Sequence, residues 1–107
     1  MSSLPVAREK CVKKTLDIIL LNALDMTPKC GYELITHVHR RFDVRLSPGT
    51  IYPLLGRLEA RGFLQSDIDE RRRRYRLTSR GKDLWRLLWS EYNRVQRAMD
   101  LPSEQAP

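Results

Sequence analysis

The sequence has few cysteines and no long run of apolar residues. Its two cysteines, Cys11 and Cys30, are too few for the disulfide framework of a small secreted domain, and we expect both to be small buried thiols. The longest apolar stretch is interrupted by Asp17, Asn22 and Asp25, and it is far shorter than the ~20 apolar residues that a membrane span requires. No signal or transit segment is visible at the N-terminus. These absences predict a cytoplasmic protein.

The sequence also lacks the residue patterns of catalysis and metal binding. It contains no nucleophile–base arrangement, no metal-ligand spacing and no phosphate-cradling loop. His37 and His39 are two residues apart, so on a regular helix they point to nearly opposite sides and cannot share a metal ion. We therefore expect solvated surface histidines, and a protein that is not an enzyme and carries no cofactor or metal.

Acidic residues are outnumbered by basic ones. The chain has 13 Asp and Glu against 20 Lys and Arg, which gives a formal charge of +7. This balance favours a polyanionic partner such as nucleic acid, or an anionic membrane surface, whereas plain solubility is the alternative explanation. A length of 107 residues predicts a single domain with one modest core, and the 41% of hydrophobic residues predicts that the chain folds.

The spacing of apolar residues predicts four helices and one β-hairpin. Pro28 ends the first helix, because the residue before a proline disfavours the helical conformation. Ser47 and Pro48 suit the N-cap and the first position of the third helix, Gly62 is its stop signal, and Thr78 can cap the last helix. Period-two alternation on both sides of a polar turn at 69–72 predicts the hairpin. The predicted helices cover residues 8–26, 30–42, 48–61 and 79–100.

This order of elements is typical of the winged variant of the helix-turn-helix fold, which is mainly α with a small β-hairpin. We expect a flexible N-terminus at residues 1–7 and a winged helix-turn-helix DNA-binding domain at 8–77. A C-terminal dimerisation helix should follow at 78–100, and a disordered tail at 101–107.

The third predicted helix keeps a proline, Pro53, well inside its apolar pattern. With Ile51, Leu54, Leu55 and Leu58 against the core, the proline faces outward among small and hydroxyl-bearing residues. Such a face suits close approach to DNA in the major groove, and its N-terminal end suits phosphate, whereas a simple kink in an exposed helix is the alternative. The candidate DNA-binding residues on this helix are Ser47, Gly49, Thr50, Tyr52, Pro53 and Arg57.

Five arginines crowd the predicted hairpin and its turn. Alternate residues of a strand point to opposite faces, so these side chains cannot all be solvated on one side. The nearby acidic residues offset their repulsion only partly, and arginine suits insertion into a narrow minor groove. A solvated charged face is the alternative. The arginines are Arg71, Arg72, Arg73, Arg74 and Arg76, of which the first four are candidate DNA-binding residues.

The first and last predicted helices are apolar over more of their surface than one small domain can cover. The first is apolar nearly all round, and the last over roughly 200° against the ~100° of an ordinary surface helix. We therefore predict a homodimer. The candidate dimerisation residues are Leu16, Ile19, Leu20, Leu84, Leu88, Tyr92, Val95 and Met99.

Three stretches of the sequence resemble the PadR family of transcriptional regulators. They are GYELI (residues 31–35), LSPGTIYPLLGRLEARG (46–62) and YRLTSRG (75–81). The resemblance implies a winged-helix domain, a dimer held by the N- and C-terminal helices, and repression through palindromic operators in double-stranded DNA, with no membrane partner. Tyr32, in the first stretch, joins the candidate DNA-binding residues.

The resemblance leaves two points open. Many relatives have a Gly-Arg-Pro element in the wing, and plain arginines replace it here, so the wing conformation and its choice of groove are undetermined. Some relatives also sense flat aromatic compounds through aromatic residues of the last helix, where this chain has Trp85, Trp89 and Tyr92. These residues are either a site for a planar aromatic effector or part of the dimer core. The alternatives to a sequence-specific regulator are a winged-helix protein-interaction module and a non-specific DNA-binding protein.

Overall fold

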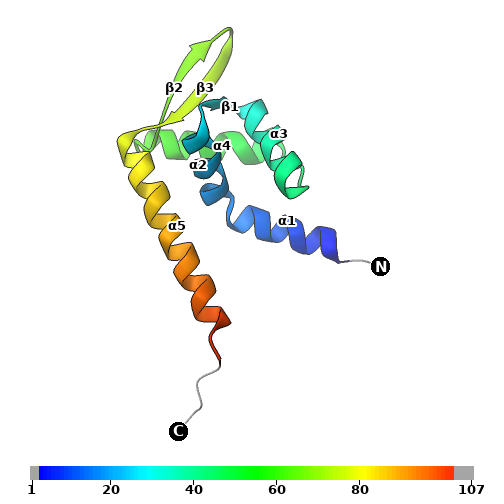
Figure 1. The fold of residues 1–107 in the computed structure, drawn as a ribbon. Helices are drawn as coiled ribbons and strands as arrows, with labels where there is room; N and C mark the ends of the chain where they lie inside the picture. Colours follow the sequence, from blue (N-terminus) through cyan, green and yellow to red (C-terminus); the bar gives the residue numbers. More distant parts are fainter. Residues whose placement is uncertain (1–2, 103–107) are drawn as a thin grey trace.

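The computed structural model describes residues 3–102, and it consists there of five helices and a three-stranded antiparallel sheet (Figure 1). This architecture confirms the predicted fold class. The predicted tail falls mostly on residues 103–107, which lie outside the described residues, as do residues 1 and 2. The elements are α1 (Leu4–Lys14), α2 (Leu16–Met26), β1 (Lys29–Cys30), α3 (Gly31–Phe42), α4 (Pro48–Ala60), β2 (Leu64–Asp69), β3 (Arg72–Leu77) and α5 (Ser79–Asp100).

The first helix is divided at Thr15, so the prediction of one continuous helix over 8–26 was wrong. The Thr15 hydroxyl donates a hydrogen bond to the carbonyl of Cys11 at 2.9 Å, a local bond that competes with regular helix geometry. The two halves also differ in burial, because α2 is buried on several sides whereas Val12 is the one buried residue of α1. The break lets α2 enter the core while α1 turns away from it (Figure 1). In addition, α1 begins at Leu4, before the predicted start.

The sheet has the order β1-β3-β2, and the two long strands form the predicted hairpin. Leu64 pairs with Leu77 and Asp69 with Arg72. Glu70 and Arg71 make the two-residue turn, and both have positive φ (49° and 68°), which matches the right-handed twist of the strands. The sequence pattern missed β1, because a strand of two residues shows no alternation.

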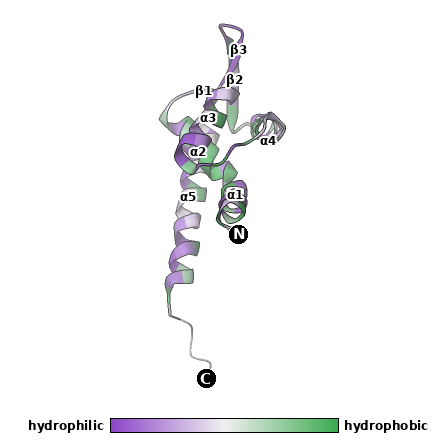
Figure 2. Ribbon diagram, turned by 90° about the vertical axis from the view of Figure 1, so that its right-hand side faces the viewer, coloured by the Kyte–Doolittle hydropathy of each residue, from purple (hydrophilic) through white to green (hydrophobic). Residues whose placement is uncertain are grey.

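The core of the domain is centred on α2, α3 and α4. The largest fully buried side chains are Leu20, Leu21, Leu34, Val38, Ile51 and Leu55. Leu16 and Leu20 were predicted dimerisation residues, but they are only 5% and 0% exposed within one chain, so they are core residues that cannot reach a partner. The C-terminal part of α5 extends beyond this core, as Figures 1 and 2 show from two sides.

The start of α5 is fixed to the loop before β2. Thr78 accepts a hydrogen bond from the Gly81 N–H at 3.0 Å, as its predicted capping role requires, and its hydroxyl donates to the carbonyl of Gly62 at 2.6 Å. Gly62 has φ +82°, which explains why glycine ends α4. A Cβ at Gly81 would lie 2.0 Å from the Phe63 carbonyl oxygen, so only glycine fits there.

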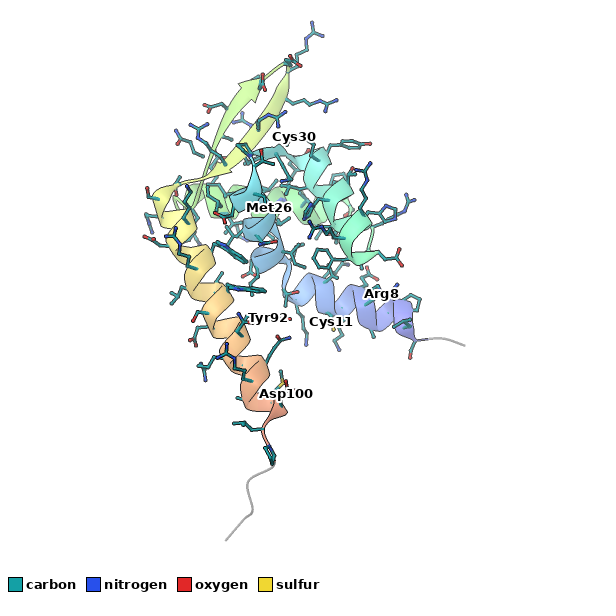
Figure 3. The ribbon with its side chains drawn as sticks, viewed as in Figure 1. Arg8, Cys11, Met26, Cys30, Tyr92 and Asp100 are labelled. Atoms are coloured by element: carbon teal, nitrogen blue, oxygen red, sulfur yellow. The ribbon has the colours of Figure 1, made fainter. Side chains whose placement is uncertain are left out.

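The two cysteines differ in environment. Cys30 is buried, as predicted, at the start of α3. Cys11 is exposed on α1, so the prediction of a buried thiol was wrong for it (Figure 3). The difference follows from the break at Thr15, which carries most of α1 away from the core.

Candidate nucleic-acid interface

Helix α4 has the two faces that its sequence predicts. Ile51, Leu55 and Leu58 are buried. Pro53 is exposed on the opposite side and lies inside the helix without breaking it. A proline cannot donate to the carbonyl four residues before it, which belongs to Gly49, and both residues are exposed, so water can reach that carbonyl. The exposed residues around Pro53 include Gly49 and Gly56, so this part of the outer face is low, while Tyr52 and Arg57 are the larger exposed side chains of α4.

The N-terminal end of α4 is open to an anion. Ser47 occupies the N-cap position, as predicted, but its side chain makes no capping bond to the helix backbone. Its Oγ lies 3.2 Å from Thr50 Oγ1, so two hydroxyls stand together beside the positive end of the helix dipole. Gly49 is exposed between them. The Thr50 and Ile51 N–H groups already donate to the Ser47 carbonyl, so this end offers an anion the Gly49 N–H and the two hydroxyls, which are donors that suit phosphate.

Tyr52 joins the beginning of α4 to the beginning of α3. A Cβ at Gly31 would lie 2.5 Å from the Tyr52 ring, so the absence of a side chain at residue 31 makes room for the tyrosine. Tyr52 remains 44% exposed, and Tyr32 in the next position of α3 is 67% exposed. Both tyrosines therefore have part of their side chains at the surface.

Arg74 ties the hairpin to α3. Its guanidinium donates to Glu33 Oε1 at 3.1 Å, to Asp69 Oδ2 at 3.3 Å and to the carbonyl of Pro28 at 3.4 Å. Its side chain is 35% exposed. Arg74 was predicted to bind DNA, but the structure gives it a role in positioning the hairpin.

Two further arginines of β3 are also bound within the chain. Arg73 donates to Ser66 Oγ at 2.9 Å, and Ser66 donates in turn to Glu59 Oε2 at 2.5 Å, which connects the hairpin to α4. Arg76 forms an ion pair with Asp67 of the neighbouring strand. These guanidinium groups are thus engaged by partners that lie far away in the sequence or across the hairpin.

Arg71 and Arg72 are the arginines that remain free at the tip of the hairpin. Both are exposed, and neither forms an ion pair within residues 3–102. The turn places them at the point farthest from the core (Figure 1). Of the four wing arginines predicted to bind DNA, these two are available, whereas Arg73 and Arg74 have partners within the chain.

Glu33 is a site residue that the sequence did not reveal. Its carboxylate accepts a hydrogen bond from the Cys30 N–H at 2.9 Å, which caps α3, and it also pairs with Arg74. The pKa of Glu33 is lowered chiefly by the hydrogen bond from the Cys30 backbone N–H. Burial opposes this shift, and the Cys30 side chain and Arg74 each add a smaller lowering effect. A serine or threonine at residue 30 would have shown the capping box in the sequence; cysteine concealed it.

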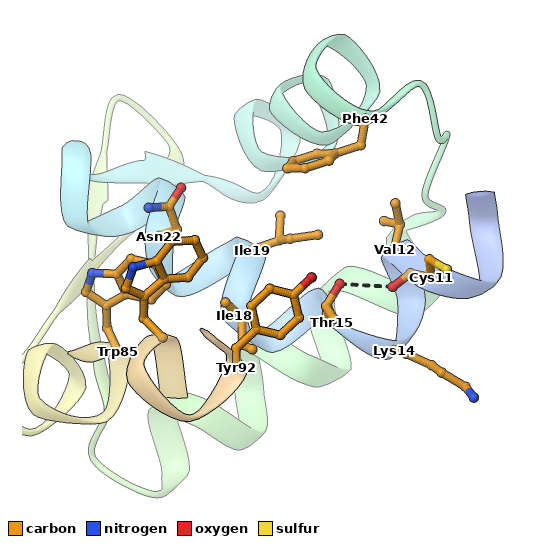
Figure 4. A pocket seen from close by; sticks show the side chains of 11 residues that line it. Cys11, Val12, Lys14, Thr15, Ile18, Ile19, Asn22, Phe42, Trp85 and Tyr92 are labelled. Atoms are coloured by element: carbon orange, nitrogen blue, oxygen red, sulfur yellow. Dashed lines mark hydrogen bonds between the residues drawn. The ribbon is translucent and has the colours of Figure 1, made fainter. Parts of the chain in front are cut away.

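The predicted aromatic residues of α5 come together on one wall of a pocket of about 580 Å³ (Figure 4). The Trp85 and Trp89 rings are 5.3 Å apart between centroids, and Trp89 stacks on Tyr92 at 6.0 Å. Ile18 and Ile19 of α2 form the facing wall. The pocket is lined by Cys11, Val12, Lys14, Thr15, Ile18, Ile19, Asn22, Phe42, Trp85, Trp89 and Tyr92.

The remaining predicted dimerisation residues differ in exposure. Leu84 and Leu88 pack partly against the core. Val95 and Met99, in the part of α5 that extends beyond the core, are 45% and 72% exposed. An apolar surface therefore continues along α5 from the aromatic pocket to its C-terminal end.

The part of the chain that the structure describes contains no cluster of three or more residues that could hold a metal ion.

His37 and His39 are both half-buried, whereas the sequence predicted that they are solvated surface residues. Burial lowers the pKa of His37, with Lys29 and Arg41 contributing.

Across residues 3–102, none of the helices has the length and apolar character needed to span a bilayer.

Comparison with known proteins identifies the family. Residues 20–86 match the transcriptional regulator PadR-like family. The transcriptional activator GvpE of Haloferax mediterranei is 37% identical over 78 residues, which are 72% of this chain and 41% of that protein. The chain spans less than half the length of the curated relatives it matches.

Solved structures share the fold. A PadR family transcription regulator from Clostridium difficile R20291 superposes with a TM-score of 0.75 at 27% identity, over 80% of this chain and 95% of that one. F93 from STIV, a winged-helix DNA-binding protein, gives a TM-score of 0.67 at 19% identity, over 78% of this chain and 91% of that one. The family and its named relatives are transcriptional regulators, which confirms the prediction that the chain is not an enzyme.

Proposed function

Since this chain belongs to the PadR-like family of transcriptional regulators and has its winged-helix DNA-binding fold, we propose that it is a homodimeric repressor that binds a palindromic operator in the cytoplasm. One observation carries the proposal: α4 buries Ile51, Leu55 and Leu58 and leaves an exposed face of small residues, while Arg71 and Arg72 stand free at the tip of the wing. A reading helix and a cationic arm on one domain suit the major groove and an adjacent groove of DNA.

In this proposal the contacts fall into two kinds. Ser47, Gly49 and Thr50 bind phosphate at the N-terminal end of α4, and Tyr32 and Tyr52 donate hydroxyls to the backbone. Arg57, which is exposed and makes no ion pair within the described chain, reads a base edge, for which arginine favours guanine. Backbone contacts set the register of the helix, and the base contact supplies specificity.

Dimerisation rests on the apolar surface of α5. Val95 and Met99 are exposed as large apolar side chains, and Trp89 is 46% exposed. A second copy would cover them, and its two-fold symmetry would place the two α4 helices on the half-sites of a palindrome.

Selection of bound fragments from genomic DNA tests this function. The expected product is an inverted repeat whose half-sites are one helical turn apart, or a multiple of it. A bound set without a shared sequence would support a non-specific DNA-binding protein instead, and failure to bind any duplex would support a protein-interaction module. A reporter placed behind the selected operator then measures the direction of regulation, because the relative GvpE is named an activator.

A second function is supported by the aromatic pocket. We propose that a planar aromatic effector enters this pocket, stacks against the aromatic rings of α5 and weakens operator binding. Such compounds should quench tryptophan fluorescence saturably and shift operator affinity, because a ligand changes an equilibrium only through differential affinity for its states. Quenching without a shift in affinity would leave a pocket without a regulatory role. No quenching would favour the alternative, in which the partner subunit fills the pocket.

A further inference from the structure

A second groove lies between the end of α1, the start of α2 and the side of α4. It has a volume of about 340 Å³ and brings together three basic side chains, one hydroxyl and one carboxylate. Its lining residues are Lys13, Lys14, Leu16, Asp17, Thr50, Leu54 and Arg57. Two of them, Thr50 and Arg57, belong to the proposed DNA-binding face, so the groove continues that face toward α1.

The groove and the wing lie on opposite sides of α4. Figure 2 shows the hairpin above α4 and α1 below it, and Figure 1 gives the same order from another side. Helix α4 therefore lies between a cationic wing tip and a cationic end of α1. A helix in the major groove, which is ~12 Å wide, has a phosphate backbone on each side. The wing can reach one of them, and α1 lies toward the other.

The charges of the groove favour an anion. Lys14 and Arg57 form no ion pair within the described residues, and Lys13 pairs with Glu9 at 3.0 Å while both side chains stay about half exposed. The carboxylate of Asp17 also lines the groove, but its Oδ1 accepts the Ile18 N–H at 2.9 Å and so serves the start of α2. The balance of the lining is three cations against one carboxylate.

We propose that Lys13 and Lys14 each bind a phosphodiester of the DNA strand that borders the groove occupied by α4, so that α1 is a third DNA-contacting element beside α4 and the wing. The proposal rests on the proposed function. Lysine suits this role because its ammonium group binds phosphate as a point charge without base specificity. Thr50 and Arg57 connect the site to the reading helix.

The test measures operator affinity against salt concentration for the full chain and for the double variant K13Q/K14Q. Each lost phosphate contact should reduce the slope of log K against log[salt] by about 0.9, so the slope should fall by roughly two per subunit. Specific and non-specific DNA should lose affinity by the same factor, because phosphate contacts carry no sequence information. The variant K13R/K14R, which keeps both charges, should restore the slope.

The matched control is K82Q/R86Q, which removes two exposed positive charges from α5 that line neither the groove nor the aromatic pocket. Circular dichroism and sedimentation check that each variant is folded and has the oligomeric state of the wild type. A salt slope for K13Q/K14Q equal to that of the control would overturn the proposal while the proposed function stands. A loss confined to specific DNA would overturn it too. Absence of DNA binding by the wild type would instead refute the proposed function.

Discussion

Arg74 of β3 and Glu33 of α3 form an ion pair at 3.1 Å that links the wing to α3. The same carboxylate caps α3 through the Cys30 N–H. One ionised side chain thus supports both the position of the wing and the first turn of α3, beside the link from Arg73 through Ser66 to Glu59.

The first prediction concerns the pH dependence of this link. Because the pKa of Glu33 is lowered in the folded protein, its ionised form stabilises the fold. That contribution is complete above the ordinary glutamate pKa of ~4.3 and disappears as the pH falls through the lowered value. The difference in Tm between wild type and E33Q should therefore shrink as the pH is lowered from 7 to 3. A constant difference would contradict this assignment, and E70Q, in the exposed turn, is the control.

The second prediction concerns two glycines in opposite surroundings. Gly81→Ala should destabilise the protein by about 1–3 kcal/mol or more, because its Cβ would collide with the Phe63 carbonyl. Gly56→Ala should stabilise it by about 0.5–1 kcal/mol, because Gly56 is an exposed helical residue with no atom within 4 Å of its added Cβ. Urea unfolding measures both. Equal effects of the two substitutions would refute the close approach at Gly81.

The third prediction concerns the wing. R71Q/R72Q should flatten the salt dependence of operator binding by roughly two units per subunit, because both guanidinium groups are free to neutralise phosphate. R76Q should change the slope less, since its guanidinium pairs with Asp67. Fold and oligomeric state should be unaffected, because the tip contributes nothing to the core. An unchanged slope in a folded R71Q/R72Q variant would show that the wing is not a DNA arm.

The fourth prediction concerns the reading helix. Arg57→Ala should weaken operator binding by about 1–3 kcal/mol and relax specificity at one base pair of each half-site. Tyr52→Phe should weaken binding with little change in sequence preference, because a hydroxyl contact to phosphate carries no base information. Selection of bound sequences by each variant distinguishes the two. If Arg57→Ala weakens all sequences equally, Arg57 binds the backbone.

The fifth prediction concerns the assembly. Sedimentation at micromolar concentration should give twice the 12.6 kDa mass of the chain. V95D/M99D should give a folded monomer with weak DNA binding, because two carboxylates would be buried in the dimer interface without partners. A folded monomeric wild type would exclude both the dimer and the palindromic operator.

The elements with local signals were predictable from the sequence. Helix α4 has a capping position, a first-turn proline and a glycine stop, and its buried and exposed faces follow from the period of its apolar residues. The hairpin follows from alternation on both sides of a polar turn. The exposed face of the candidate site was predictable for the same reason, because a helix with one apolar side must expose the other.

The features set by tertiary contacts were not predictable. The apolar pattern continues across Thr15, so its periodicity does not reveal the break between α1 and α2, where the Thr15 hydroxyl bonds to the Cys11 carbonyl. The partners of Arg73 and Arg74 include Glu59 through Ser66 and Glu33, which lie far away in the sequence. Only the three-dimensional structure therefore separates the two free arginines of the wing tip from those that hold the wing in place.

The break at Thr15 has a mechanical consequence. Cys11, Val12 and Thr15 form part of the wall of the aromatic pocket, while Lys13 lines the groove beside α4 and Lys14 borders both cavities. A rotation of α1 about this joint therefore changes the width of the aromatic pocket and the position of the lysines at the same time. The two cavities are thus connected through the end of α1, because neighbouring residues there line one or the other and Lys14 lines both.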